Sequence, residues 1–148
     1  MSTIAEPKTM GRVLTEVKLE NLKDLWEVEK GMRTDADVRR TVVLDALVDT
    51  GASTLSLPSS MIKQLGLQFT SKRRIRCATG LAEVNLFEAV KFTIQGRDGI
   101  LGVMEVPDEV PVLVGQLPLE MLDFVVDPSS RRLIGNPAHN GEWIMELY

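Results

Sequence analysis

One carboxylate in this sequence stands in a setting that suits catalysis. Asp49 follows a run of apolar residues and precedes a glycine turn, in the segment Ala46–Ser53. An ordinary surface turn also favours Asp-x-Gly, because Asp accepts backbone hydrogen bonds and Gly adopts positive φ. Here, however, the two residues before Asp49 are apolar, and apolar character resumes at Leu55–Leu57. Asp49 is therefore the candidate catalytic residue.

A second element of related character lies further along the chain. Leu113-Val114-Gly115 is again an apolar pair that ends in glycine. The segment Leu117–Leu122 follows it and has Pro118 in its first turn, which predicts a short helix. A helix is also predicted over Ser59–Leu65.

The segments that must position these residues have mostly the character of strands. The apolar period of two residues over Val13–Leu19 predicts a half-buried strand. The apolar, β-branched segment Val38–Val48 predicts a central strand buried on both faces. Leu25–Glu29 is expected to be extended, and a turn is expected at 97–99, where Asp-Gly separates two apolar stretches. Further strands are predicted over 73–78, 82–94, 100–106 and 110–114, with a hairpin formed by 124–126 and 132–134. Together, the predicted strands and helices indicate a mostly β fold, a barrel or sandwich with one or two short helices.

Composition limits the class of protein. The chain has 148 residues, enough for one domain, which we assign to residues 11–148 after a flexible tail at 1–10. A net charge of −4 argues against nucleic acid as the main partner. The single cysteine excludes an internal disulfide, and no apolar run is long enough to span a membrane. The polar start of the chain predicts no signal peptide and a cytoplasmic location.

The two glycine-containing elements together resemble those of the retropepsin-like aspartic peptidases. The family signature is an apolar pair followed by Asp-Thr-Gly-Ala, which corresponds to 47–52 here, and the later signature corresponds to Leu113-Val114-Gly115. Between them the family carries a flap hairpin, whose tip corresponds to Ala78-Thr79-Gly80. The resemblance extends from Val42 to Ile134 and implies a retropepsin-like closed β-barrel.

The resemblance also implies a mechanism. Two carboxylates held close together share a proton, so one acts as general base toward water while the other acts as general acid. This chain supplies one such residue, Asp49, so the second carboxylate is expected from Asp49 of a partner chain. The implied protein is a homodimeric aspartic endopeptidase that acts on extended peptides and uses no cofactor and no metal.

Further residues take roles through the same resemblance. Thr50, Gly51 and Ala52 are expected to support the catalytic loop, with Thr50 bonding across to the other subunit. The residues expected to contact substrate are Ser53, Thr54, Ala78, Thr79 and Gly80. Val13–Leu19 and Trp143–Tyr148 are candidates for the dimer interface. Many family members have an acidic residue where this chain has Ser53 and Thr54, and the segment Asn21–Arg40 is longer than the minimal family pattern.

Alternative interpretations remain for several features. The basic run Lys72–Arg76 is interpreted as a solvated strand face, since no aromatic residues are interleaved with its cations. His139 lies in a turn-like segment and is not expected to be catalytic, and Cys77 is expected to be a small strand residue beside the flap tip. Two other functions stay open: a peptide-binding or assembly module that keeps the fold without proteolysis, and an unrelated β-barrel in which Asp-Thr-Gly is a plain turn.

Overall fold

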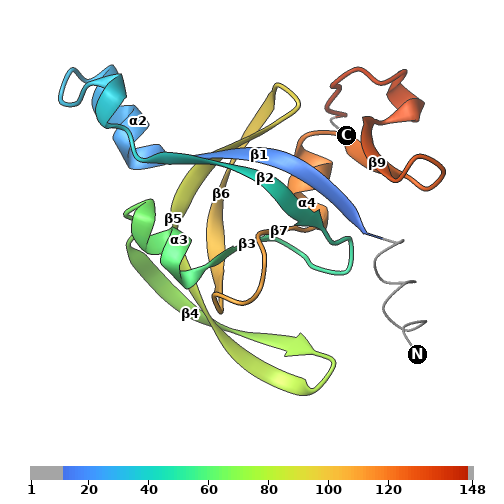
Figure 1. Cartoon of the computed structure of the whole chain (residues 1–148), viewed down its shortest axis with the longest axis horizontal. Helices are drawn as coiled ribbons and strands as arrows, with labels where there is room; N and C mark the ends of the chain where they lie inside the picture. Colours follow the sequence, from blue (N-terminus) through green and yellow to red (C-terminus); the bar gives the residue numbers. More distant parts are fainter. Residues whose placement is uncertain (1–11, 147–148) are drawn as a thin grey trace.

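The computed structural model describes residues 12–146, and the predicted tail at 1–10 lies outside this range (Figure 1). The fold is mostly β, as predicted from the sequence. The strands are β1 Val13–Asn21, β2 Arg40–Val48, β3 Leu55–Pro58, β4 Phe69–Cys77, β5 Gly80–Ile94, β6 Arg97–Val106, β7 Leu113–Val114, β8 Phe124–Asp127 and β9 Arg132–Gly135. The helices are α2 Leu22–Glu29, α3 Ser59–Gln64 and α4 Gln116–Met121, with short 3-10 helices at Asp35–Asp37 and Pro137–His139.

Seven strands form one sheet in the order β1-β2-β7-β3-β6-β5-β4. Strand β1 also pairs with β5, from Lys18 opposite Thr93 to Asn21 opposite Val90. This extra pairing closes six of the strands into a ring and leaves β4 outside it, where β5 is its one partner among the described strands. The separate hairpin β8–β9 has the predicted position, with Asp127 opposite Arg132.

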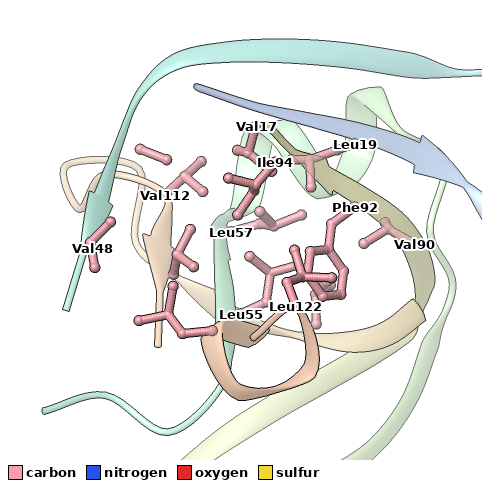
Figure 2. Close-up of a cluster of buried hydrophobic side chains, with 14 of the residues drawn as sticks. Val17, Leu19, Val48, Leu55, Leu57, Val90, Phe92, Ile94, Val112 and Leu122 are labelled. Atoms are coloured by element: carbon pink, nitrogen blue, oxygen red, sulfur yellow. The ribbon is translucent and has the colours of Figure 1, made fainter. Parts of the chain in front are cut away.

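The hydrophobic core fills the inside of the ring (Figure 2). At the end of strand β5 every second side chain points into the core. These are Val90, Phe92 and Ile94, and all three are almost fully buried. Strand β1 does the same with Val17 and Leu19, so the predicted half-buried strand is confirmed. Burial of this kind is the main favourable term that stabilises the ring.

The prediction of an extended segment over Leu25–Glu29 is wrong, because these residues lie in helix α2. The side chain of Asn21 caps the helix by accepting a hydrogen bond from the backbone N–H of Asp24 at 3.0 Å. The described residues thus contain three α-helices, one more than the largest number expected. Helices α3 and α4 lie within one residue of their predicted bounds.

The expectation that β2 is buried on both faces is also wrong. Val42 is 51% and Leu44 is 73% exposed, whereas Ala46 is fully buried. The pairing of β2 with β1 shifts register between Val43 and Ala46, so alternate residues before the shift face solvent, whereas Ala46 after it faces the core.

The turn between β5 and β6 lies two residues before the predicted Asp-Gly turn. Ile94 pairs with Arg97, so Gln95 and Gly96 form the two-residue loop, and Asp98 lies within β6. Both loop residues have positive φ, 49° and 80°, as a tight hairpin turn with the right-handed twist requires.

Candidate active site

Asp49 lies directly after β2, at the end of its parallel pairing with β7. Its backbone N–H donates to Val114 O at 2.9 Å, so the strand ladder continues through this residue. The Asp49 carboxylate accepts a hydrogen bond from Gly51 N at 2.9 Å, and its carbonyl accepts one from Ala52 N at 3.0 Å. These contacts fix a tight turn with a half-buried carboxylate at its start.

Gly115 joins the two elements singled out in the sequence. A Cβ at this position would lie 2.5 Å from Thr54 O and 2.7 Å from Ala52 O. Its φ of −86° is open to any residue. Glycine is therefore required here by the close approach of the Asp49 loop to the start of α4.

Backbone hydrogen bonds fasten the loop to that helix start. Gly115 N donates to Thr54 O, Gln116 N to Ala52 O and Leu117 N to Ser53 O, at 2.9 to 3.0 Å. Because the backbone makes these contacts, the side chains of the loop remain available for a ligand. Ser53 is exposed and Thr54 half-buried, while Thr50 and Gly51 are exposed beside the carboxylate.

Strand register shows which side chains share the face of the sheet on which Asp49 lies. Side chains alternate along a strand, so Asp49 lies on the same face as Leu47, opposite to the core residue Val48. Paired residues on neighbouring strands also point to one face, so the strand pairing defines a row of side chains across the sheet. The row consists of Leu47, Leu113, Ser56, Met104, Leu86 and Ser71. We call this surface the Asp49 face.

The Asp49 face is mainly apolar and half-exposed. Within the row, only Ser56 is fully buried, and its Oγ has no hydrogen-bond partner in the described part of the chain. The sequence analysis missed this row, because its members lie on strands whose order and register the sequence alone does not reveal.

The hairpin β4–β5 continues the Asp49 face beyond the ring. Its tip is the two-residue turn Ala78-Thr79, closed by the pair Cys77 and Gly80, and Gly80 has a φ of 119°. All three residues predicted for the flap tip are exposed. In Figure 1 the tip and the loop after β2 project to the same side of the molecule. The structure therefore brings the predicted substrate residues onto one side, with the tip apart from the Asp49 loop.

His139, the lone histidine, is held in a structural ion pair. Its Nδ1 lies 2.6 Å from Asp123 Oδ2, and its Nε2 lies 3.7 Å from Glu146. The Asp123 carboxylate raises the pKa of His139, and the imidazole in turn lowers the pKa of Asp123. The same Asp123 oxygen accepts a hydrogen bond from Ile144 N at 3.2 Å, so the pair fastens the C-terminal segment.

Neither a metal site nor a membrane-crossing helix is found in residues 12–146. No group of three or more His, Cys, Asp or Glu side chains is placed to hold a metal ion. None of the helices there combines the length and apolar character needed to cross a bilayer.

Comparison with protein families places the chain in a known class. Residues 35–137 match the family model described as aspartyl protease, of retropepsin-like type. This match covers more than half of the chain and includes the Asp49 loop, the hairpin and Gly115. The chain therefore belongs to the aspartyl protease family, which confirms the resemblance noted from its two motifs. A search of curated proteins found no significant match.

Proposed function

We propose that this protein is a homodimeric aspartic endopeptidase in which each subunit supplies one Asp49 carboxylate. The observation that carries this proposal is the packing of Gly115 against the Asp49 loop, which holds a half-buried carboxylate at a fixed strand end. A plain surface turn has no need of this support. The alternative of an Asp-Thr-Gly turn without catalytic function explains neither the close approach nor the family match.

Two carboxylates related by a two-fold axis give the chemistry that peptide hydrolysis needs. One carboxylate is ionised and takes a proton from water, while the other is protonated and donates to the substrate carbonyl oxygen or the leaving amine. The Thr50 side chain, which is exposed beside Asp49, is free to bond across to the other subunit.

The need for a second subunit follows from the sequence, which contains a single Asp-Thr-Gly. The C-terminal segment supports an interface, because Trp143, Ile144 and Met145 are apolar and between 42% and 73% exposed. Residues 147 and 148 of the proposed interface segment lie outside the described range. In Val13–Leu19, by contrast, the side chains that alternate inward belong to the core.

The substrate proposed is an extended peptide that lies along the Asp49 face. The half-exposed apolar side chains of that face supply contacts for alternate residues of a bound strand. Ser53 and Thr54 border the carboxylate, and Ala78, Thr79 and Gly80 form the tip that closes over the peptide. The hairpin is suited to such movement because β4 pairs with only one neighbour.

The test is cleavage of a peptide library from acidic to neutral pH by wild type and Asp49→Asn, with mass in solution measured for both. We expect a dimeric wild type that cleaves and a dimeric Asp49→Asn that does not. Cleavage that survives the substitution contradicts the proposal. A folded wild-type dimer that binds peptides and cleaves none supports a binding module instead.

A further inference from the structure

The two faces of the β4–β5 hairpin differ in charge. On the Asp49 face, continuing from Ser71 and Leu86, the side chains alternate through Arg73, Ile75 and Cys77 on β4, with Val84 and Ala82 opposite on β5. Arg73 is the only charged residue in this set. The opposite face carries the other three cations of the basic run, Lys72, Arg74 and Arg76.

Arg73 is exposed and, like Arg74 and Arg76 on the opposite face, has no ionic partner in residues 12–146. On the opposite face, Lys72 has Glu83 within 3.6 Å. The paired part of the hairpin, from Phe69 to Phe87, thus holds four cations and one anion within a chain of net charge −4. An unpaired guanidinium on a protein of negative net charge is a local site for a carboxylate. The guanidinium can bind the carboxylate with two parallel hydrogen bonds.

We propose that Arg73 makes this protein select substrates that carry an acidic residue where the peptide passes the β4–β5 hairpin. The inference rests on the proposed function, since it needs the peptide to lie along the Asp49 face. Nucleic acid is disfavoured as the ligand because the Asp49 face of the hairpin offers no aromatic ring for base stacking. An apolar neighbour on each side, Val84 across the strand and Ile75 along it, lowers the local dielectric constant and strengthens the pairing.

The two-fold symmetry of the proposed dimer predicts how many substrate positions show the acidic preference. Each subunit contributes one Arg73, so the acidic preference should appear at two substrate positions, one on either side of the cleaved bond. Because an extended peptide alternates its side chains, the positions next to these two should show no preference. A general attraction between a basic protein surface and an acidic peptide would not discriminate in this way.

The experiment uses short fluorescent peptides with an apolar centre and one Glu or Gln at each flanking position in turn. Cleavage is measured for wild type, Arg73→Gln and Arg74→Gln, where Arg74 is the matched control on the opposite face of the same strand. For wild type and Arg74→Gln, we expect kcat/KM to favour Glu over Gln by about five-fold at two positions. In Arg73→Gln this ratio should fall to about one. A further variant, Arg73→Glu, assayed with added peptides that carry Lys at the same positions, should favour Lys over Glu.

A second readout separates this inference from the proposed function. Binding of the same peptides to each variant is measured in an Asp49→Asn background, by fluorescence polarisation at low and high salt. A Glu preference that depends on Arg73 in binding, without cleavage by wild type, supports the inference and contradicts the peptidase. Cleavage without a Glu preference, or a preference lost equally in Arg74→Gln, overturns the inference but does not contradict the proposed peptidase function. Neither binding nor cleavage overturns both.

Discussion

At Gly115 the available space, and not the backbone angle, dictates the residue. Gly115→Ala would place a methyl group 2.5 Å from Thr54 O, so the Asp49 loop or the start of α4 must move. We expect a loss of about 1–3 kcal/mol in the free energy of unfolding, together with a loss of cleavage. Chemical denaturation and the peptide assay measure these two effects.

Gly102→Ala is the matched control for that substitution. Its Cβ would have one tight contact, 3.2 Å from Phe87 O, within β6 and away from the Asp49 loop. We expect a smaller loss of stability and retained cleavage. Equal stability and activity of Gly115→Ala and wild type would contradict the argument that Gly115 joins the two motifs.

Cys77 at the hairpin tip is a second position where single contacts set the chemistry. Hydrogen bonds from Thr79 lower the pKa of the exposed Cys77 thiol. A larger thiolate fraction at neutral pH should make the protein react about two- to five-fold faster with iodoacetamide than Thr79→Val does. Mass spectrometry of the modified peptide gives the rates. Equal rates for the two proteins would show that Thr79 does not activate the thiol.

At the scale of elements, helix α2 in the segment Asn21–Arg40 depends on one buried carboxylate. Asp24 is fully buried and accepts two side-chain hydrogen bonds from Arg39 at 2.8 and 2.9 Å, with Arg33 at 3.3 Å. These cations lower the pKa of Asp24 from 3.8 to about 2. The contacts tie the helix to the chain that leads into β2, the strand that ends at Asp49.

Removal of this charge should destabilise the fold in a pH-dependent way. Because the folded pKa lies below the unfolded value, the stabilisation is present in full above pH 3.8 and is lost as pH falls through about 2. Asp24→Asn should lower the unfolding free energy at neutral pH by about 2 kcal/mol or more, and the difference should shrink toward pH 2. Denaturant unfolding across pH measures this.

The pair of Asp35 and Arg40 in the same segment provides the control. These side chains approach to 2.9 Å, but Asp35 is 75% exposed. Asp35→Asn should therefore change stability by less than about 1 kcal/mol. Similar losses for Asp24→Asn and Asp35→Asn would contradict the role assigned to burial.

The segment Asn21–Arg40 also shows what the sequence could not predict. Helices α3 and α4 and the hairpin β8–β9 carry local signals, such as Pro in a first turn and a polar turn segment, and they were found. Helix α2 is held by contacts between Asp24 and Arg39, fifteen residues apart, and no local pattern reports such a pair. The turn at Gln95-Gly96 was misplaced because Asp98-Gly99 offers an equally good local signal.

The motif around Asp49 was recognisable, whereas the surface around it was not. Asp49 and Gly115 stand in short apolar contexts that a sequence shows directly. The Asp49 face depends on the pairing of β2 with β7 and of β3 with β6, both parallel and joined by long connections. Only this register separates Arg73 from Arg74, which the sequence presents as two neighbours in one basic run.

For the whole molecule, the proposed dimer depends on a C-terminal segment that one ion pair holds in place. Asp123 accepts hydrogen bonds from the backbone of Ile144 and from Asn136, and it pairs with His139. The indole of Trp143 donates to Met121 O at 3.2 Å. Loss of the Asp123–His139 pair should therefore loosen the apolar residues that we assign to the subunit interface.

The dimer should weaken as pH rises through the pKa of His139. The pKa of His139 is raised above 6.5, so its contribution is complete below pH 6.5 and is lost as pH rises through the folded value. The neighbouring Glu146, at 3.7 Å, acts in the same direction. Sedimentation from about pH 5 to about pH 9 should show a dissociation constant that increases with pH, in an Asp49→Asn background that removes titration of the dyad.

His139→Gln in the same background is the comparison that assigns this effect. The amide cannot carry the charge, so its dimer should be weaker than the parent at acidic pH and nearly insensitive to pH across the same range. A pH profile of dissociation that is unchanged by His139→Gln would separate the C-terminal segment from the interface.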